Sequence, residues 1–397
     1  MSNAREVVVV SGVRTAIGDF GGALKDLSPT ELGARVTREA ISRAGIEAAE
    51  IGHVVFGNVI QTEPKDMYLS RVCAMNGGIP QETPAMTLNR LCGSGLQAIV
   101  SAAQSIMLGD ADIALAGGAE SMSRSNYVMP AARWGQRMGD EPLIDWMTGA
   151  LSDPFDKEHM GVTAERIAER WSLSRELQDE YALESHRRAA AAIAAGHFKS
   201  QILPVELKGK KGTVIFDTDE HVRPDVQLGD MTKLRAVFQK DGTVTAGNAS
   251  GLNDAAAAVV LMERGIAEKK GLKPLARLVS YGHAGVDPKI MGIGPVPAIR
   301  KILARQSLTM GDIGVIELNE AFASQALACT RSLGLDDEDH RVNPNGGAIA
   351  LGHPLGMSGA RITGSAAIEL AQGTGRYAIV SMCVGVGQGS ALLLERV

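Results

Sequence analysis

A cysteine stands at the point where an apolar run meets a helix of small residues. Cys92 follows residues 84–88, which are typical of a strand, and precedes residues 94–107, which are typical of a helix. A strand, a tight glycine-containing turn and a helix start together present a side chain at an exposed corner. The dipole and N–H groups of the helix N-terminus favour a thiolate there. The arrangement indicates covalent catalysis, although a cysteine among apolar residues is more often a small buried hydrophobic residue.

A histidine and a second cysteine have similar glycine-rich surroundings. His353 lies in the run 345–359, just before a predicted helix, and an imidazole beside a thiol can take its proton. Cys383 follows the predicted strand 377–382 and precedes alternate glycines, whose backbone N–H groups can approach a ligand as in an oxyanion hole. Because two cysteines in one cleft cannot both attack the same carbon, Cys383 is a candidate general acid or base.

A carboxamide and an aromatic side chain follow the predicted strand 313–318. Asn319 can donate a hydrogen bond or hold a water molecule, and Phe322 can form the wall of an apolar slot. The same stretch also has an interpretation as a helix cap, and this alternative stays open at the level of the residues.

Strands and helices alternate on both sides of a middle segment of different character. Residues 121–247 hold all three tryptophans and local clusters of Lys and Arg, which predict either solvated loop charge or contact with a polyphosphate ligand. The alternation outside this segment indicates a mainly parallel sheet covered on both faces. Gly117-Gly118 is interpreted as a turn, Ser28 to Glu31 as a capping box, and Ser174 as the cap of a helix to residue 195. The predicted strands are 7–10, 51–59, 84–88, 113–116, 255–262, 275–280, 313–318 and 377–382.

The two alternating regions resemble each other in sequence. Setting Ser94 against Ser358 aligns them without gaps and brings identical small residues together, and residues 51–55 parallel residues 313–317. The common order of elements predicts two similar α/β halves with an insertion between them. In such a pair, loops at equivalent strand ends can converge on one cleft.

Composition excludes several classes of protein. The formal net charge of −5 gives no overall nucleic-acid or membrane footprint, and we expect no apolar run to reach membrane-spanning length. The four cysteines match neither a zinc pattern nor a disulfide framework, which favours a reducing compartment. The first and last residues show neither a signal peptide nor a peroxisomal address, so we expect a cytoplasmic protein without a metal.

Taken together, these stretches resemble the thiolase family over essentially the whole chain. The resemblance rests on residues 89–96, 319–323, 345–359 and 383–389, and also on residues 159–165, 242–254 and 292–297. Ala236 departs from the family pattern, which commonly has proline there. The resemblance implies an acyltransferase that reversibly condenses two acyl-CoA molecules into a 3-ketoacyl-CoA and CoA by a ping-pong mechanism, as in polyhydroxyalkanoate synthesis. CoA thioesters are substrates, and no further cofactor is implied.

The resemblance also implies a role for each matching residue. Cys92 corresponds to the acylated nucleophile, His353 to the residue that activates it, and Cys383 to the acid/base at the α-carbon. Asn319 corresponds to a residue that forms one oxyanion hole with His353 through a water molecule, and the N–H groups of Cys92 and Gly385 to the other. The implied acyl-CoA contacts are Ser250, His159, Met160, Ala321, Phe322 and, for the nucleotide, Arg223.

The implied fold is a five-layer αβαβα core built from two duplicated halves. The expected division is 1–120 plus 248–274 for the N-terminal half, 121–247 for a loop domain that covers CoA, and 275–397 for the C-terminal half. The family also implies a homotetramer, with its tetramerisation loop near residues 127–139.

Other functions remain as alternatives. A degradative 3-ketoacyl-CoA thiolase of broader chain length would use the same residues. A ketoacyl-synthase-type enzyme would be expected to have histidine or asparagine in place of Cys383. A cysteine hydrolase would leave Cys383 without a role, and a non-catalytic CoA-binding protein would not need both cysteines and the histidine.

Overall fold

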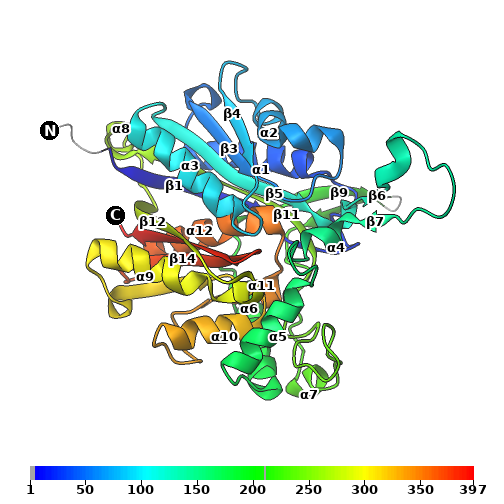
Figure 1. Cartoon of the computed structure of the whole chain (residues 1–397). Coiled ribbons are helices and arrows are strands. Elements are labelled where there is room, and N and C mark those ends of the chain that lie inside the picture. Colours follow the sequence, from blue (N-terminus) through cyan, green and yellow to red (C-terminus); the bar gives the residue numbers. More distant parts are fainter. Residues whose placement is uncertain (1–4, 210–211) are drawn as a thin grey trace.

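The computed structural model describes residues 5–209 and 212–397 (Figure 1). Its main feature is a large sheet in which hydrogen-bonded neighbours follow the order β13-β14-β15-β12-β1-β11-β5-β3-β4. The strands are β1 (Val7–Thr15), β3 (His53–Gly57), β4 (Ala85–Leu88), β5 (Ile113–Ser121), β11 (Asn253–Glu263), β12 (Ala276–Gly285), β13 (Ile313–Leu318), β14 (Tyr377–Val384) and β15 (Gln388–Glu395), with the short β2 (Gly18–Asp19) and β8 (Ile202–Leu203) beside β11 and β1. All eight strands predicted from the sequence are present, whereas β15 and the short strands β2 and β8 are not among the predictions.

The sheet repeats one strand pattern twice. In the first half β3 is parallel to β4 and β5, and the antiparallel β11 joins β5 to β1. In the second half β13 is parallel to β14, the antiparallel β15 joins β14 to β12, and a parallel bridge from Ile316 to Val342 takes the place of β4. The halves meet where β1 pairs with β12 over residues 7–9. This topology confirms the predicted duplication. The prediction of a mainly parallel sheet is wrong, because the strands β11, β15, β1 and β12 pair with their neighbours in antiparallel fashion.

Helices form three layers around the two halves of the sheet (Figure 1). The helices α3 (Ser94–Leu108) and α12 (Leu355–Gln372) pack on each other between the halves. Outside, α1 (Pro29–Ala44) and α2 (Leu69–Gly77) cover the first half, while α9 (Pro295–Gln306) and α10 (Ala323–Ser332) cover the second. Alternation along β11 produces this layering, because Ala257 and Val259 face the central helices while Ala258 and Val260 face α1 and α2. The predicted five-layer core is confirmed.

Glycine allows the central layer to pack tightly. A Cβ atom on Gly359 would lie 2.2 Å from the backbone nitrogen of Leu96, and one on Gly118 would lie 1.9 Å from the carbonyl oxygen of Gly356. Gly117 and Gly118 therefore lie inside β5, and the predicted turn at this position is wrong. The glycines are needed here for the close approach of α12 to the strand.

One helical stretch of the described chain, residues 91–108, is apolar and long enough to cross a membrane. The expectation that no run reaches that length is therefore wrong. In this structure 56% of the stretch is buried, and α3, which makes up most of it, packs against α12 and β5. A core helix with both faces covered needs the same apolar composition as a membrane span.

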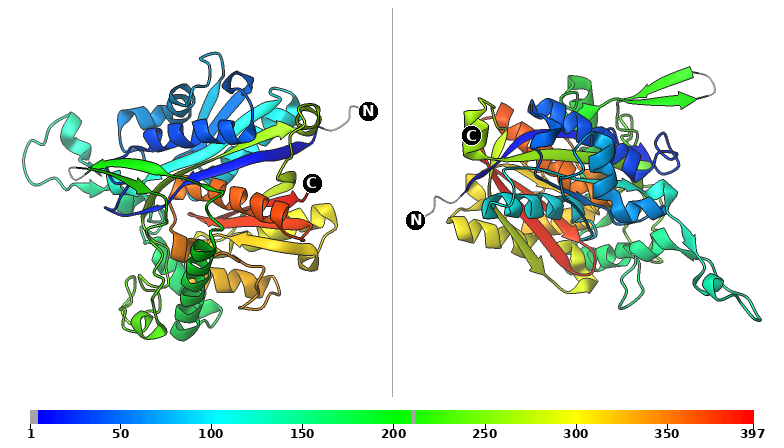
Figure 2. Two further views of the ribbon diagram at one scale, coloured as in Figure 1. Left: turned by 180° about the vertical axis from the view of Figure 1, so that it is seen from behind. Right: turned by 90° about the horizontal axis from the view of Figure 1, so that it is seen from above.

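The middle segment packs against both halves and sends out two hairpins. Its helices are α4 (Trp146–Ala150), α5 (Met160–Arg170), α6 (Arg175–Ala195) and α7 (Leu228–Met231). One hairpin pairs β6 (Tyr127–Val128) with β7 (Ile144–Asp145), and the other pairs β9 (Val205–Gly209) with β10 (Gly212–Phe216); both project from the body (Figure 2). The predicted caps at Ser28 and Ser174 are confirmed. The short helices α8 (Arg264–Lys269) and α11 (Ala348–Leu351) complete the list. The three-part domain division stays a proposal.

Candidate active site

A cavity of about 670 Å³ lies where the loops of the two halves meet the middle segment. Apolar side chains such as Met147 and Leu252 form much of its wall. Every residue implied by the resemblance lines it except Asn319 and Cys383, so its lining includes Cys92, His353, Gly385, Ser250, His159, Met160, Arg223, Ala321 and Phe322. An apolar cleft with a few converging polar groups is typical of a small-molecule site.

Cys92 occupies the corner between β4 and α3, as predicted. It is half-buried, and the preceding residue, Leu91, has a φ of 47°, a conformation that costs energy for a residue with a side chain. Burial raises the pKa of the Cys92 thiol to about 11, against the opposing effect of the N–H groups of Gly385 and of Cys92 itself. The expectation that the helix N-terminus favours a thiolate is therefore wrong for the free protein. Desolvation outweighs the donors, so a base must take the proton when Cys92 reacts.

His353 has its two ring nitrogens in defined roles. Its Nδ1 lies 2.7 Å from Oγ of Ser358, whose hydroxyl donates to the carbonyl oxygen of Pro354 at 2.9 Å. The hydroxyl proton of Ser358 is used in the bond to Pro354, so Oγ can only accept a hydrogen bond from His353. Nδ1 of His353 therefore carries the ring proton. Burial, aided by the positive charge of Arg361, lowers the pKa of His353 to about 3. The imidazole is therefore neutral, and its Nε2 atom carries the lone pair that can accept a proton.

Asn319 and Cys383 lie behind the cavity wall, beside the residues that line it. The Nδ2 atom of Asn319 lies 3.4 Å from Nε2 of His353, and its Oδ1 atom is buried without a hydrogen-bond partner. The helix-cap interpretation of Asn319 is wrong, because α10 begins four residues later and has no side-chain cap. Cys383 lies near the end of β14, where burial raises the pKa of its thiol and a charge on Cys92 would raise it further. The two cysteines therefore share one electrostatic environment.

Gly385 places its backbone N–H toward Cys92 from a strained turn. The next residue, Val386, has a φ of 64°, which is a genuine outlier for a β-branched residue. Leu91 beside Cys92 and Val386 beside Gly385 thus place a strained residue next to each of the two N–H groups that approach the sulfur. Such strain persists only where the surrounding structure enforces it, and it is concentrated at functional sites.

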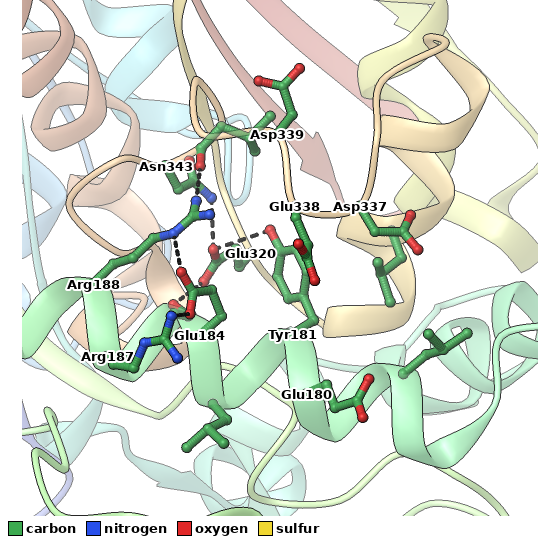
Figure 3. A pocket seen from close by; sticks show the side chains of 15 residues that line it. Glu180, Tyr181, Glu184, Arg187, Arg188, Glu320, Asp337, Glu338, Asp339 and Asn343 are labelled. Carbon is green, nitrogen blue, oxygen red and sulfur yellow. Dashed lines mark hydrogen bonds and ion pairs between the residues drawn. The ribbon is translucent and has the colours of Figure 1, made fainter.

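A second cavity, of about 530 Å³, opens between α6 and residues 337–343, and its floor is a buried carboxylate (Figure 3). Glu320 accepts hydrogen bonds from Tyr181, from Ser185 at 2.7 Å and from Asn343 at 2.7 Å. It also accepts the N–H of Ile349 in the first turn of α11, at 3.1 Å. Glu320 therefore anchors the loop of Asn319 and the loop that leads to His353 on α6.

Several residues of the main cavity were not singled out from the sequence. Phe238 stacks on His159, with ring centroids 4.6 Å apart, and His221 lies close to Arg223 in the wall. His221 also pairs with Asp19, and this contact lowers the pKa of that carboxyl. Met291, which also lines the cavity, immediately precedes the motif 292–297 and was not assigned a role. No local signal marks Phe238 or His221, because only tertiary packing brings them to the cavity.

Comparison with known proteins gives the same picture over the full chain. Two family models match it: "Thiolase, N-terminal domain" over residues 7–265 and "Thiolase, C-terminal domain" over residues 272–396. The chain is 67% identical to the beta-ketothiolase BktB of Cupriavidus necator, over 99% of this chain and all of that protein. It is 50% identical to an acetyl-CoA acetyltransferase of Syntrophomonas wolfei, over 98% and 99% of the two chains.

Solved structures of thiolases have the same fold as this chain. The crystal structure of human mitochondrial 3-ketoacyl-CoA thiolase superimposes with a TM-score of 0.97 at 45% identity, covering 99% of this chain and all of that one. The structure of the same human enzyme in complex with CoA gives 0.95 at 44% identity, covering 99% and 98%. With both family models matching and these relatives covered from end to end, the chain belongs to the thiolase family.

Proposed function

We propose that the chain is an acetyl-CoA C-acetyltransferase, a β-ketothiolase that reversibly joins two acyl-CoA molecules into a 3-ketoacyl-CoA and CoA. The observation that carries this proposal is the convergence of Cys92, His353 and Gly385 in one cavity, with Asn319 and Cys383 directly behind them. The names of the two bacterial relatives point to the same chemistry.

In the first half-reaction Cys92 becomes acylated. Its sulfur attacks the thioester carbonyl carbon of acetyl-CoA while Nε2 of His353 takes the thiol proton. The N–H groups of Cys92 and Gly385 donate to the developing oxyanion. The carbon–sulfur bond to CoA then breaks, and the departing sulfur takes a proton from Cys383. The products are acetyl-Cys92, CoA, a protonated His353 and a Cys383 thiolate.

In the second half-reaction the acyl group moves to carbon. The Cys383 thiolate removes an α-proton from the second acetyl-CoA, and His353 with a water molecule held by Asn319 stabilises the enolate oxygen. The carbanion attacks the acyl carbon, the bond to Cys92 breaks, and Cys92 recovers its proton from His353.

The remaining cavity residues bind the CoA thioester. His159, Met160, Ser250, Ala321 and Phe322 line the slot for the acyl and pantetheine groups, and Arg223 contacts the nucleotide. We expect no metal or redox cofactor, because the reaction needs only a nucleophile, two proton carriers and hydrogen-bond donors.

The proposal is tested by mass spectrometry of the intact protein after incubation with acetyl-CoA. A mass increase of one acetyl group is expected, and Cys92→Ala should abolish it. Cys73→Ala provides a matched control, since Cys73 is fully buried under α1 and donates to Thr30. An adduct that persists at the wild-type level in Cys92→Ala would place the nucleophile elsewhere.

The second candidate function is that of a degradative 3-ketoacyl-CoA thiolase. The likeness to the human 3-ketoacyl-CoA thiolase favours it. Thiolysis of 3-ketoacyl-CoA substrates of increasing chain length separates the two: a steep loss of kcat/KM beyond four carbons supports the acetyl-CoA acetyltransferase, and a flat profile supports the degradative enzyme.

The quaternary state is also a proposal. The hairpin of β6 and β7 projects with Trp134 87% exposed and Met138 89% exposed, an apolar surface that a monomer would leave in water (Figure 2). We assign it to tetramer formation between copies of this chain, in the cytoplasm.

A further inference from the structure

The carboxylate of Glu120 connects the two catalytic loops, and nothing in the proposed mechanism uses it. Glu120 lies near the end of β5 and is fully buried. The residues that line the main cavity, among those the structure describes, include its neighbour Val59 but not Glu120 itself. It therefore contacts loops rather than substrate.

Each oxygen of this carboxylate accepts two hydrogen bonds. Oε2 accepts from the N–H of Gly356 at 2.7 Å and of Val59 at 3.0 Å. Oε1 accepts from the N–H of Ile60 at 2.9 Å and from Nδ2 of Asn58 at 3.1 Å. Three donors come from the loop that follows β3 in the first half, and one comes from the first turn of α12 in the second half.

The hydrogen bond from Gly356 connects Glu120 to His353 through the first turn of α12. Gly356 is the second residue of α12, where free N–H groups and the helix dipole favour a negative partner. The same turn carries Ser358, which orients His353, and Pro354, which accepts the Ser358 hydroxyl. A shift of this turn would therefore move the imidazole.

The contacts of Glu120 with residues 58–60 connect it to the loop of Cys92. The carbonyl of Val59 accepts from Nδ2 of Asn89, whose Oδ1 accepts the N–H of Leu91, the residue before the nucleophile. Glycine brings the elements this close, because a Cβ atom on Gly356 would lie 2.8 Å from Oε2 of Glu120. One carboxylate thus ties the loop of Cys92 to the helix turn of His353.

We propose that Glu120 is a positioning residue that sets the separation of the Cys92 thiol and the His353 imidazole across the boundary between the two halves. Its contribution appears in the rate of acylation, because proton transfer requires the two groups at hydrogen-bond distance. Substrate affinity is expected to change little, because the residues assigned to the CoA thioester, His159, Met160, Ser250, Ala321, Phe322 and Arg223, lie on other segments of the chain. This proposal rests on the roles assigned to Cys92 and His353.

The chemistry of the site makes Glu120→Gln an informative variant. Because each oxygen of Glu120 receives two donors, an amide NH₂ group faces two N–H donors whichever way the amide turns. Glu120→Asp keeps the charge but shortens the side chain by about 1.5 Å, so it cannot hold both loops at once. It serves as the second variant if Glu120→Gln does not fold.

Asp66→Asn is the matched control. Asp66 is also fully buried, and its Oδ2 accepts from Thr62 and Glu63 within its own segment, without a bond to the second half. It is close enough for its charge to raise the pKa of Glu120. The control therefore removes a neighbouring buried charge and leaves the connection between the catalytic loops intact.

The experiment measures single-turnover acylation by acetyl-CoA and steady-state thiolysis, both normalised to Cys92 titrated by alkylation. We expect Glu120→Gln and Glu120→Asp to lower the acylation rate and kcat about 10- to 100-fold, with KM within twofold of wild type, while Asp66→Asn stays within about threefold in kcat. Wild-type rates in a folded Glu120 variant, or an equal loss in Asp66→Asn, would overturn the positioning role. If the wild-type chain forms no acyl adduct on Cys92, the proposed function itself fails instead.

Discussion

Oγ of Ser358 lies 2.7 Å from Nδ1 of His353 and donates its own proton to the carbonyl oxygen of Pro354. This relationship determines the tautomer of the base, because Ser358 can only accept from the ring. Nε2 is then the basic nitrogen, and it is the one that lies next to Asn319. The tautomer follows from two distances and the single proton of a hydroxyl group.

Ser358→Ala should lower kcat with little change in KM, because the imidazole loses the acceptor that holds its tautomer and orientation. The expected loss is about 10- to 100-fold, by analogy with the partners that orient metal-bound histidines. Steady-state thiolysis measures it. Ser365→Ala lies two turns further along α12, where Ser365 donates to Gln201 at 2.8 Å, and should keep wild-type kcat. Equal kinetics in both variants would remove the role of Ser358.

Cys383→Ala should separate the two half-reactions. Cys92 and His353 remain in place, so the acetyl adduct should still form, although more slowly because Cys383 no longer protonates the departing CoA. Condensation should fall by at least about 100-fold, within the usual range for loss of a general acid–base group. Adduct mass and acetoacetyl-CoA formation are the two measurements, with Cys329→Ala as a buried-cysteine control. Normal condensation in Cys383→Ala would exclude its assigned role.

Alkylation of Cys92 by iodoacetamide should keep accelerating up to high pH. Burial raises the pKa of this thiol to about 11, so the thiolate fraction at neutral pH is small and grows about tenfold per pH unit until that value. The pKa of His353, lowered to about 3, means that no further step is expected near pH 6.5. Peptide mapping after timed alkylation gives the profile. A plateau below pH 8 would instead indicate a preformed thiolate–imidazolium pair.

Protonation of His353 should contribute to the loss of folding stability at low pH. Between pH 3 and the ordinary pKa of about 6.5, the unfolded chain binds a proton that the folded site does not, so stability falls as the pH is lowered through that window. Thermal unfolding between pH 4 and 7 tests this expectation, and His353→Gln should show a weaker dependence on pH. An identical dependence in the variant would assign the acid sensitivity to other groups.

Asp219→Asn should destabilise the fold more than the loss of a surface ion pair. The Arg14–Asp219 pair is bidentate, at 2.6 and 2.8 Å, and both side chains are almost completely buried. Removing one charge leaves the other unpaired, which costs about 3–5 kcal/mol in buried pairs. Asp26→Asn, in the exposed pair with Lys25, should cost at most about 1 kcal/mol. Midpoints of denaturant unfolding compare the two, and equal midpoints would contradict the expected difference.

The double variant Trp134→Ser/Met138→Ser should shift the tetramer toward smaller species. Both side chains are exposed at the projecting hairpin, far more than is usual for large apolar residues. Light scattering after size-exclusion chromatography measures the mass. Phe155→Ser changes another exposed aromatic residue, which lies outside the hairpin, and should leave the mass unchanged. An unchanged tetramer in the double variant would place the interface elsewhere.

The sequence alone determined much of this protein. The run around Cys92, the glycine-rich stretches around His353 and Cys383, and the alternation of strands and helices indicated two similar α/β halves with converging loops, whereas the five-layer core was implied by the resemblance to thiolases. These are local patterns, because the spacing of apolar residues, the caps and the glycines act over a few positions of the chain.

Only the tertiary structure decided the electrostatics and the connections. The thiolate expected at Cys92 is a thiol, because desolvation depends on what other parts of the chain pack around the sulfur. The two glycines of β5 are a second example. Their sequence predicts a turn, but they lie inside a strand because α12 packs closely against them. The acceptor for Nδ1 of His353 and the bonds from Glu120 to Gly356 and Val59 join residues whose proximity arises from folding, so composition and spacing could not show them.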